Sequence, residues 1–96
     1  MATELVHVGF GNILAASRVI AIVSPNSAPT RRLIQEARQR SQLADLTSGR
    51  KTKAVIVMYS GHVVLAAITP ETIAGRVLAM RGGTPIRTTT LDEEHD

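Results

Sequence analysis

The sequence predicts a small α/β protein of the α+β type, in which two helices pack against a mixed β-sheet. Three apolar runs rich in β-branched residues are typical of buried strands. Ser27 and Thr69 each place a capping hydroxyl just before a proline that is tolerated in the first helical turn, which predicts two helix starts. A chain of 96 residues is long enough for one such domain. The three apolar runs are residues 19–23, 54–58 and 63–68.

The first quarter of the chain predicts two short strands joined by a turn. Residues 5–8 are expected in the first strand, and Ile13 with Leu14 in the second. Between them, Gly9-Phe10-Gly11-Asn12 suits a turn or bulge with positive φ, because glycine and asparagine tolerate left-handed backbone. The buried strand at residues 19–23 follows.

The middle of the chain predicts a helix over residues 28–41, because its apolar residues recur at helical spacing. A short strand is expected at residues 43–46, and Tyr59-Ser60-Gly61-His62 suits a hairpin turn between the second and third apolar runs. The apolar stripe of the helix is formed by Leu33, Ile34 and Ala37.

The end of the chain predicts a second helix from Pro70, with Gly82-Gly83 as its stop. Residues 84–96 show no apolar period, which predicts a flexible tail. The inward-facing residues expected in this helix are Ile73, Val77 and Leu78.

The charge distribution predicts an anionic partner. Residues 1–87 hold eleven lysines and arginines against four carboxylates, a net charge of +7, whereas the last five residues hold four carboxylates. A small body this basic is typical of proteins that bind a polyanion. The absence of cysteine excludes thiolate catalysis and disulfides and fits a reducing compartment. No signal peptide or membrane span is recognised, so a cytoplasmic, nucleoid-associated location is expected.

The apolar runs also predict an oligomer. None of them alternates polar and apolar residues, and such strands are usually covered on both faces of the sheet. Two short helices do not easily cover both faces, so the simplest missing cover is another copy of the chain. The alternative is an imperfectly covered face, which would leave an apolar patch prone to association.

No residue pattern indicates an enzyme, a metal site or a cofactor site. Gly49-Arg50-Lys51-Thr52 lacks the earlier glycine of a phosphate-binding P-loop, and His7 and His62 lie too far apart in the sequence to suggest a metal pair. The carboxylates of the body are scattered rather than paired for acid–base catalysis. With one phenylalanine and one tyrosine, a stacking platform for single-stranded bases is not expected, which favours contact with the phosphates of a duplex.

The strongest functional candidate is Ser48-Gly49-Arg50-Lys51-Thr52-Lys53, in which three cations and a glycine precede the buried strand at residues 54–58. The rigid strand holds these cations at a fixed place on the surface, and fixed cations suit the phosphate chain of a nucleic acid. The alternative is that they solvate a turn. Arg31 and Arg32 on the first helix could likewise contact phosphates or simply be solvated, and a solvated helix face is the commoner outcome.

Five short segments together match the pattern of one known family. On these segments the chain resembles the RemA family of small bacterial DNA-binding regulators, which are tied to genes for extracellular matrix and biofilm. The likeness covers residues 5 to about 78. The segments are Val8-Gly9-Phe10-Gly11-Asn12, Ser17-Arg18-Val19-Ile20, Val23-Ser24-Pro25 with Ser27-Ala28-Pro29, Ile34-Gln35-Glu36-Ala37-Arg38, and Gly49-Arg50-Lys51-Thr52.

The resemblance implies a protomer related to the LytTR-type DNA-binding domain and a closed homo-oligomeric ring, an octamer in the best-understood members. It implies that residues 1–78 form the RemA-like DNA-binding domain. Residues 79–96 would form the end of the C-terminal helix and a flexible acidic tail. Double-stranded DNA is the expected partner, with no small-molecule substrate and no membrane.

The resemblance also implies the DNA contacts. Arg18 and Arg50 match arginines of the family, and Lys51 stands where the family has a further arginine. This lysine keeps the charge but lacks the planar, bidentate fork of a guanidinium. Further phosphate contacts are considered at Lys53 and, on the helix, at Arg31 and Arg32.

The expected function is therefore that of a transcriptional regulator of extracellular matrix and biofilm genes that binds duplex DNA through basic loops repeated around a ring. The alternative is a structural or RNA-binding basic ring without promoter function.

Overall fold

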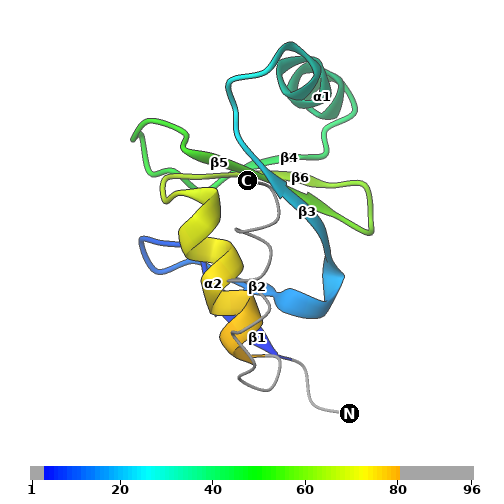
Figure 1. Ribbon diagram of the computed structural model, residues 1–96. Helices are drawn as coiled ribbons and strands as arrows, with labels where there is room; N and C mark the ends of the chain where they lie inside the picture. Colours follow the sequence, from blue (N-terminus) through cyan, green and yellow to red (C-terminus); the bar gives the residue numbers. More distant parts are fainter. Residues whose placement is uncertain (1–3, 81–96) are drawn as a thin grey trace, which may run out of the picture.

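The computed structural model describes residues 4–80, which form two β-sheets and two α-helices (Figure 1). The predicted class, a mixed sheet with two helices, is confirmed. The helices are α1 (Ala28–Gln39) and α2 (Pro70–Met80), and a short 3-10 helix, η1 (Ala16–Arg18), is also present. The strands are β1 (Leu5–His7), β2 (Ile13–Ala15), β3 (Val19–Val23), β4 (Leu43–Asp45), β5 (Ala54–Met58) and β6 (Val63–Ala66).

The larger sheet has the strand order β3-β5-β6-β4, so β5 and β6 lie at its centre. β5 pairs antiparallel with β3 and β6, whereas β4 pairs parallel with β6. The predicted hairpin turn joins β5 to β6, with Met58 N donating to His62 O at 3.0 Å and Gly61 at a φ of 95°. The smaller sheet is the antiparallel β1–β2 hairpin, in which Val6 pairs with Leu14.

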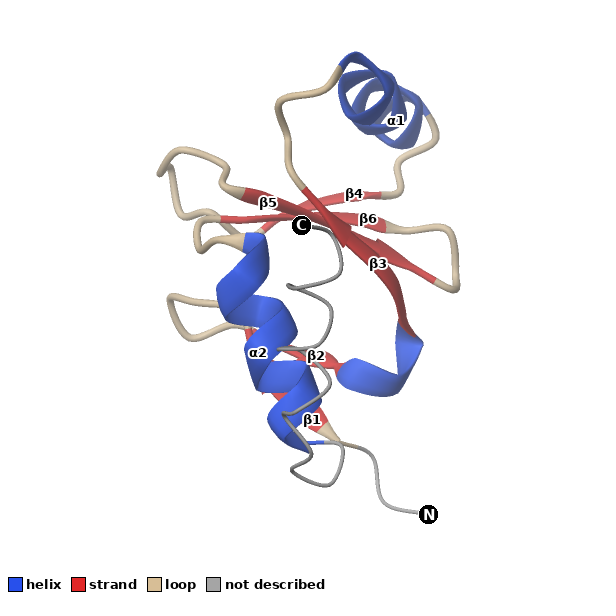
Figure 2. Cartoon of the chain, in the orientation of Figure 1, coloured by secondary structure: helices blue, strands red, loops and turns tan. Residues whose placement is uncertain are grey.

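Different elements cover the two faces of the larger sheet (Figures 1 and 2). On one face, Ala37 of α1 packs with Val55 and Leu65. On the opposite face, Ile73 of α2 packs in a cluster with Ile56 and with the β1–β2 hairpin. The neighbours Val55 and Ile56 belong to opposite clusters, and both are 0% exposed. This two-sided burial explains why the strand sequences lack polar alternation.

Contrary to expectation, the sheet face that two helices would leave open for another copy is covered by the chain itself. The β1–β2 hairpin lies beside α2 on the same face of the sheet and supplies the missing cover (Figure 2). Val6 and Val8 in this hairpin are 1% and 0% exposed. Among the described residues, the large apolar side chains that are exposed lie instead on the outer side of the hairpin, on the edge strand β3 and in turns. They are Leu5, Phe10, Ile13, Ile20 and Tyr59.

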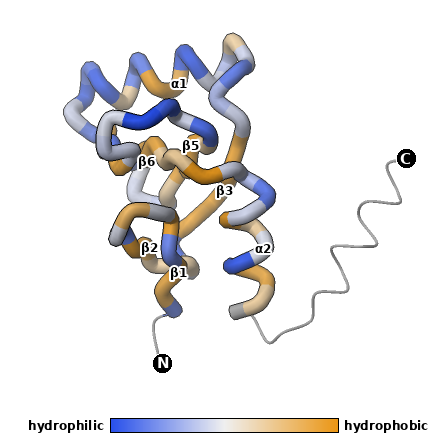
Figure 3. The backbone as a smooth tube through the Cα atoms, turned by 90° about the vertical axis from the view of Figure 1, so that its left-hand side faces the viewer, coloured by the Kyte–Doolittle hydropathy of each residue, from blue (hydrophilic) through white to orange (hydrophobic). Residues whose placement is uncertain are grey.

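Helix α1 follows from a local cap and a narrow apolar stripe. Ser27 Oγ accepts a hydrogen bond from Thr30 N at 3.2 Å and satisfies an amide of the first turn. The helix ends at Gln39, earlier than the predicted residue 41, because Ser41 adopts a left-handed φ of 59°. Figure 3 shows the consequence: the strands are mostly hydrophobic, whereas α1 is largely hydrophilic and covers the sheet as an outer layer.

Helix α2 is capped in the same way. Thr69 Oγ1 accepts a hydrogen bond from Thr72 N at 3.3 Å. The strand before it, β6, ends at Ala66 rather than at residue 68, because its ladder partner β5 begins at Ala54. The predicted helix stop at Gly82-Gly83 and the predicted tail at residues 84–96 lie outside the described residues.

The packing of α2 against the sheet predicts a graded loss of stability. Ile73→Ala should lower the free energy of unfolding by about 2–5 kcal/mol, because Ile73 is 1% exposed and its truncation leaves a cavity. Ile73→Val removes one methylene and should cost about 0.5–1.5 kcal/mol. Urea unfolding followed by circular dichroism measures both. Equal effects of the two variants, or no effect, would contradict this placement of α2.

Candidate nucleic-acid interface

The loop between β4 and β5 presents Arg50 on a tight turn. Arg50 N donates to Thr47 O at 3.0 Å, and the residues between them, Ser48 and Gly49, have φ values of 56° and 81°. Positive φ at both central positions is typical of a type I′ turn. Residues 48–53, here called the basic loop, therefore begin in a closed, specific backbone conformation.

Asp45 and Thr47 hold the base of this loop. Asp45 Oδ1 accepts hydrogen bonds from the Thr47 hydroxyl at 2.6 Å and from Thr47 N at 2.9 Å. Thr47 is 2% exposed, so these bonds satisfy polar groups that are shielded from water. The hydrogen bonds from Thr47, the side-chain bond first, hold the pKa of Asp45 below its ordinary value of 3.8, with a smaller contribution from the charge of Arg38.

A second tight turn, between β1 and β2, docks against the basic loop. Asn12 N donates to Gly9 O at 3.0 Å, and the residues between them, Phe10 and Gly11, have φ values of 53° and 80°. Asn12 Nδ2 also donates to Gly9 O at 3.0 Å and, across to the β4–β5 connection, to Leu46 O at 3.2 Å. One side chain thus closes its own turn and ties it to the neighbouring loop.

This docking brings Phe10 to Arg50. The Arg50 guanidinium carbon lies 3.9 Å from the centroid of the Phe10 ring, which is a cation–π contact. The sequence predicts neither Phe10 nor Asn12 as a site residue. Its only signal is the Gly-Phe-Gly-Asn turn at residues 9–12, and no local pattern shows which other loop that turn meets.

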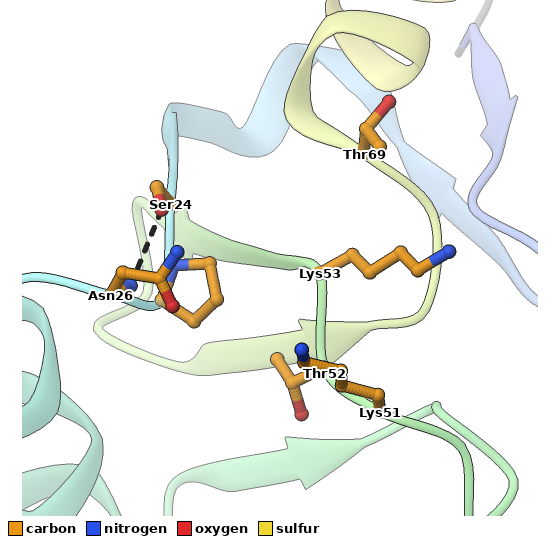
Figure 4. Close-up of a pocket in the computed structure, with 7 residues that line it drawn as sticks. Ser24, Asn26, Lys51, Thr52, Lys53 and Thr69 are labelled. Carbon is orange, nitrogen blue, oxygen red and sulfur yellow. Dashed lines mark hydrogen bonds between the residues drawn. The ribbon is translucent and has the colours of Figure 1, made fainter.

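Lys51 and Lys53 line an open cavity of about 220 Å³. Figure 4 shows the Lys53 side chain extending below Thr69, with Ser24 and Asn26 on the other side of the cavity. The described lining offers ammonium, hydroxyl and amide groups and no carboxylate, so it suits an anion. The lining residues are Ser24, Pro25, Asn26, Lys51, Thr52, Lys53 and Thr69.

The helix arginines differ in their relation to this cavity. Arg31 and Arg32 are both exposed on α1. Arg31 Nη2 donates to the carbonyl of Asn26, a residue that lines the cavity, at 3.3 Å, which places Arg31 at the rim. Over the part of the chain that the structure describes, the ion pair present joins Arg40 and Glu36 at 4.0 Å. The cations of the basic loop therefore have no carboxylate partner among these residues.

Arg18 lies at the opposite end of the sheet. It ends η1 just before β3, and its carbonyl accepts a hydrogen bond from Tyr59 N at 2.8 Å. The β3–β5 register pairs Val19 with Met58, the last residue of β5, whereas the basic loop precedes the first residue of that strand. At about 3.3 Å per residue, the length of β5 separates Arg18 from the basic loop by more than about 13 Å. The structure brings Arg50, Lys51 and Lys53 together and leaves Arg18 apart.

Other surfaces of the described chain offer fewer polar or charged groups for binding a ligand. A second cavity, of about 280 Å³, is mostly apolar and lies between β1 and α2, where Arg76 Nη1 donates to His7 O at 2.8 Å. Between residues 4 and 80, no three metal-binding side chains gather. No helix over the same residues combines the length and apolar character needed to cross a membrane.

Comparison with known proteins decides the family. A family model described as "Extracellular matrix regulatory protein A-like", or RemA-like, matches residues 5–77. The chain belongs to the RemA-like family. The resemblance found in the five sequence segments is confirmed, and the matched residues run from β1 into the last turn of α2.

Similar proteins are named as regulatory proteins. The RemA-like chain is 62% identical over 82 residues to one from Synechococcus elongatus, covering 85% of this chain and 94% of that protein. It is 64% identical over 83 residues to one from Dehalococcoides mccartyi, covering 86% of each. It is 58% identical over 81 residues to one from a Cyanothece species, covering 84% of this chain and 89% of that protein. The family and these names indicate a regulatory role rather than an enzymatic one.

The bonds at the base of the loop predict a pH-dependent contribution to stability. Because the pKa of Asp45 is lower in the folded chain, its carboxylate stabilises the fold above the ordinary pKa of 3.8 that it has when unfolded. This contribution is lost as the pH falls through the folded pKa. Asp45→Asn should therefore lower the melting temperature slightly at neutral pH and not at strongly acid pH. A difference in melting temperature that does not change with pH would contradict this role.

Proposed function

We propose that this RemA-like protein is a DNA-binding transcriptional regulator of extracellular matrix and biofilm genes. It binds duplex DNA through its basic loops, which are repeated around a homo-oligomeric ring, and acts in the cytoplasm at the nucleoid. The observation that supports this most directly is the basic loop itself. Arg50 stands on a fixed turn beside Lys51 and Lys53, with no carboxylate partner among the described residues.

The chemistry of the loop favours phosphates over bases. Cations held on a rigid backbone suit the regularly spaced phosphates of a duplex, where such contacts position the protein. The hydroxyl groups of Ser24, Thr52 and Thr69 around Lys51 and Lys53 offer further hydrogen bonds to phosphate oxygens. Arg31 at the rim of that cavity is the helix arginine that best suits an additional contact.

We propose an oligomer because one copy supplies few cations for binding phosphates. With Arg18, Arg50 and Lys51, one chain neutralises at most about three phosphates, each adding roughly −0.9 to the slope of log K against log salt. A ring, an octamer by the resemblance, repeats the set along one duplex and so raises affinity without new kinds of contact. The exposed Leu5 and Ile13 on the hairpin and Ile20 on the edge strand offer apolar surface for such an assembly.

The alternative function is a structural or RNA-binding basic ring without promoter function. Binding of the intact chain to duplex DNA, to RNA and to an acidic peptide, measured at one stated salt concentration, separates the two. The proposal requires tightest binding to duplex DNA and a steep loss of affinity with salt. Equal binding to RNA, or preference for the peptide, would overturn it.

Arg50→Ala should weaken duplex binding at least about tenfold, because each charge-assisted bond to phosphate is worth about 1.5–3 kcal/mol. Folding and oligomer size should not change, because Arg50 is exposed. Arg40→Ala is the matched control. It removes the same charge just past the C-terminal end of α1, about 13 Å of helix away from Arg31 at the cavity rim. Fluorescence anisotropy and size-exclusion chromatography measure both properties. Equal loss of binding in the two variants would show that only net charge matters.

Arg18→Ala and Arg50→Ala should have additive effects on the free energy of DNA binding. The two residues lie at opposite ends of β5, so within one copy they reach different phosphates. Effects of sites this far apart usually add within about 0.5 kcal/mol. Anisotropy titrations of the single and double variants give the comparison. A double variant no weaker than either single one would mean that both residues serve the same contact, for instance across two neighbouring copies.

A further inference from the structure

We propose that Phe10 is a positioning residue that holds the Arg50 guanidinium in the orientation used for DNA, so that the β1–β2 turn and the basic loop work as one unit. This inference rests on the proposed function. The juxtaposition behind it is the contact of 3.9 Å between the Arg50 guanidinium carbon and the Phe10 ring centroid.

The backbone around Phe10 is unusual for an aromatic residue. Phe10 has a φ of 53° and stands between Gly9 and Gly11, whose φ values are 102° and 80°. A left-handed conformation at a bulky residue costs free energy, and Phe10 as a whole remains 48% exposed to water. Neither burial of the ring nor backbone preference explains why a phenylalanine stands at this turn. Its contact with the Arg50 guanidinium gives a reason.

The two loops are fixed to each other independently of this contact. Asn12 Nδ2 donates to Gly9 O in its own turn and to Leu46 O in the β4–β5 connection, at 3.0 and 3.2 Å. Arg50 N is fixed to Thr47 O at 3.0 Å. These hydrogen bonds hold the backbone of the β1–β2 turn and the backbone of the basic loop in place. The Phe10 ring then restricts the part that is still free to move, which is the long side chain of Arg50.

Stacking leaves the arginine able to bind. A cation–π contact uses the flat face of the guanidinium, whereas its N–H groups point outward in the plane. The edge therefore stays available for a bidentate contact to phosphate oxygens. Holding the side chain in advance lowers the conformational entropy lost on binding. A lysine at this position lacks such a planar fork, so the arrangement specifically suits an arginine.

The first experiment is a double-variant cycle on DNA binding by the full chain. Phe10→Leu, which keeps an apolar side chain without the ring, should weaken binding about two- to fivefold, the size expected for an exposed cation–π contact. Phe10→Tyr keeps the ring and should bind like the original chain. In an Arg50→Ala background, measured at low salt where binding persists, Phe10→Leu should have no further effect.

Two outcomes of the cycle would overturn the inference. If Phe10→Leu weakens binding equally with and without Arg50, Phe10 contacts DNA or supports the loop in another way. If Phe10→Tyr is as weak as Phe10→Leu, the aromatic face is not what matters. Thermal melting of each variant shows whether it folds. If Phe10→Leu does not fold, Phe10→Tyr still tests whether a chain that keeps the ring binds DNA like the original chain.

A second measurement does not depend on DNA. NMR relaxation of the Arg50 Nε–H group should show a restricted side chain in the original chain and in Phe10→Tyr, and a more mobile one in Phe10→Leu. Equal mobility in all three would overturn the positioning role. If the restriction is present but the original chain fails to bind duplex DNA, the stack stands and the proposed function fails.

Discussion

Strands β5 and β6 are buried from both sides, and the other elements are arranged around that burial. Val55 and Ile56 are successive residues that contact different layers, and neither is exposed to water. One layer is α1; the other is α2 together with the β1–β2 hairpin (Figure 1). A strand held on both faces and in two ladders has little freedom to shift. Its two ends are therefore fixed points on the surface of the molecule.

The basic loop lies at one of these fixed points. Its cations follow a closed turn at Thr47–Arg50, and their last member, Lys53, donates its backbone N–H to Ala66 O at 2.8 Å on the neighbouring strand. Binding groups held in this way are ordered before a partner arrives, so less entropy is lost when one binds. Among the described residues other than glycine, Phe10 and Ser48 have positive φ in this region, and Ser41 has one after α1. Concentration of backbone strain in one region is common at sites of function.

The other end of β5 carries a second, separate cation. Arg18 lies there, beside the hairpin turn that begins at Tyr59. A single copy thus presents cations at two ends of a sheet rather than in one patch. For the function proposed above, this geometry suits an extended polyanion better than a small anionic ligand held in one pocket. It also agrees with the regulatory role that the RemA-like family indicates.

Elements with local signals could be predicted from the sequence. The strands at residues 19–23 and 54–58 were predicted with the bounds that the structure shows, because each is a continuous β-branched run between turn residues. The helix starts followed from Ser27 and Thr69, whose hydroxyls cap amides three residues later in the chain. The grouping of Arg50 with Lys51 and Lys53 also needed no fold, because these residues are sequence neighbours.

The way in which distant segments meet could not be predicted and is seen in the folded chain. The hairpin covers the sheet face that appeared to need another copy, because it folds beside α2, at least 55 residues away in the chain. Asn12 reaches Leu46 across 34 residues, and the same docking puts the Phe10 ring on Arg50. The separation of Arg18 from the basic loop depends on the register of β3 against β5. Such contacts are set by packing between elements, and no spacing within a single segment encodes them.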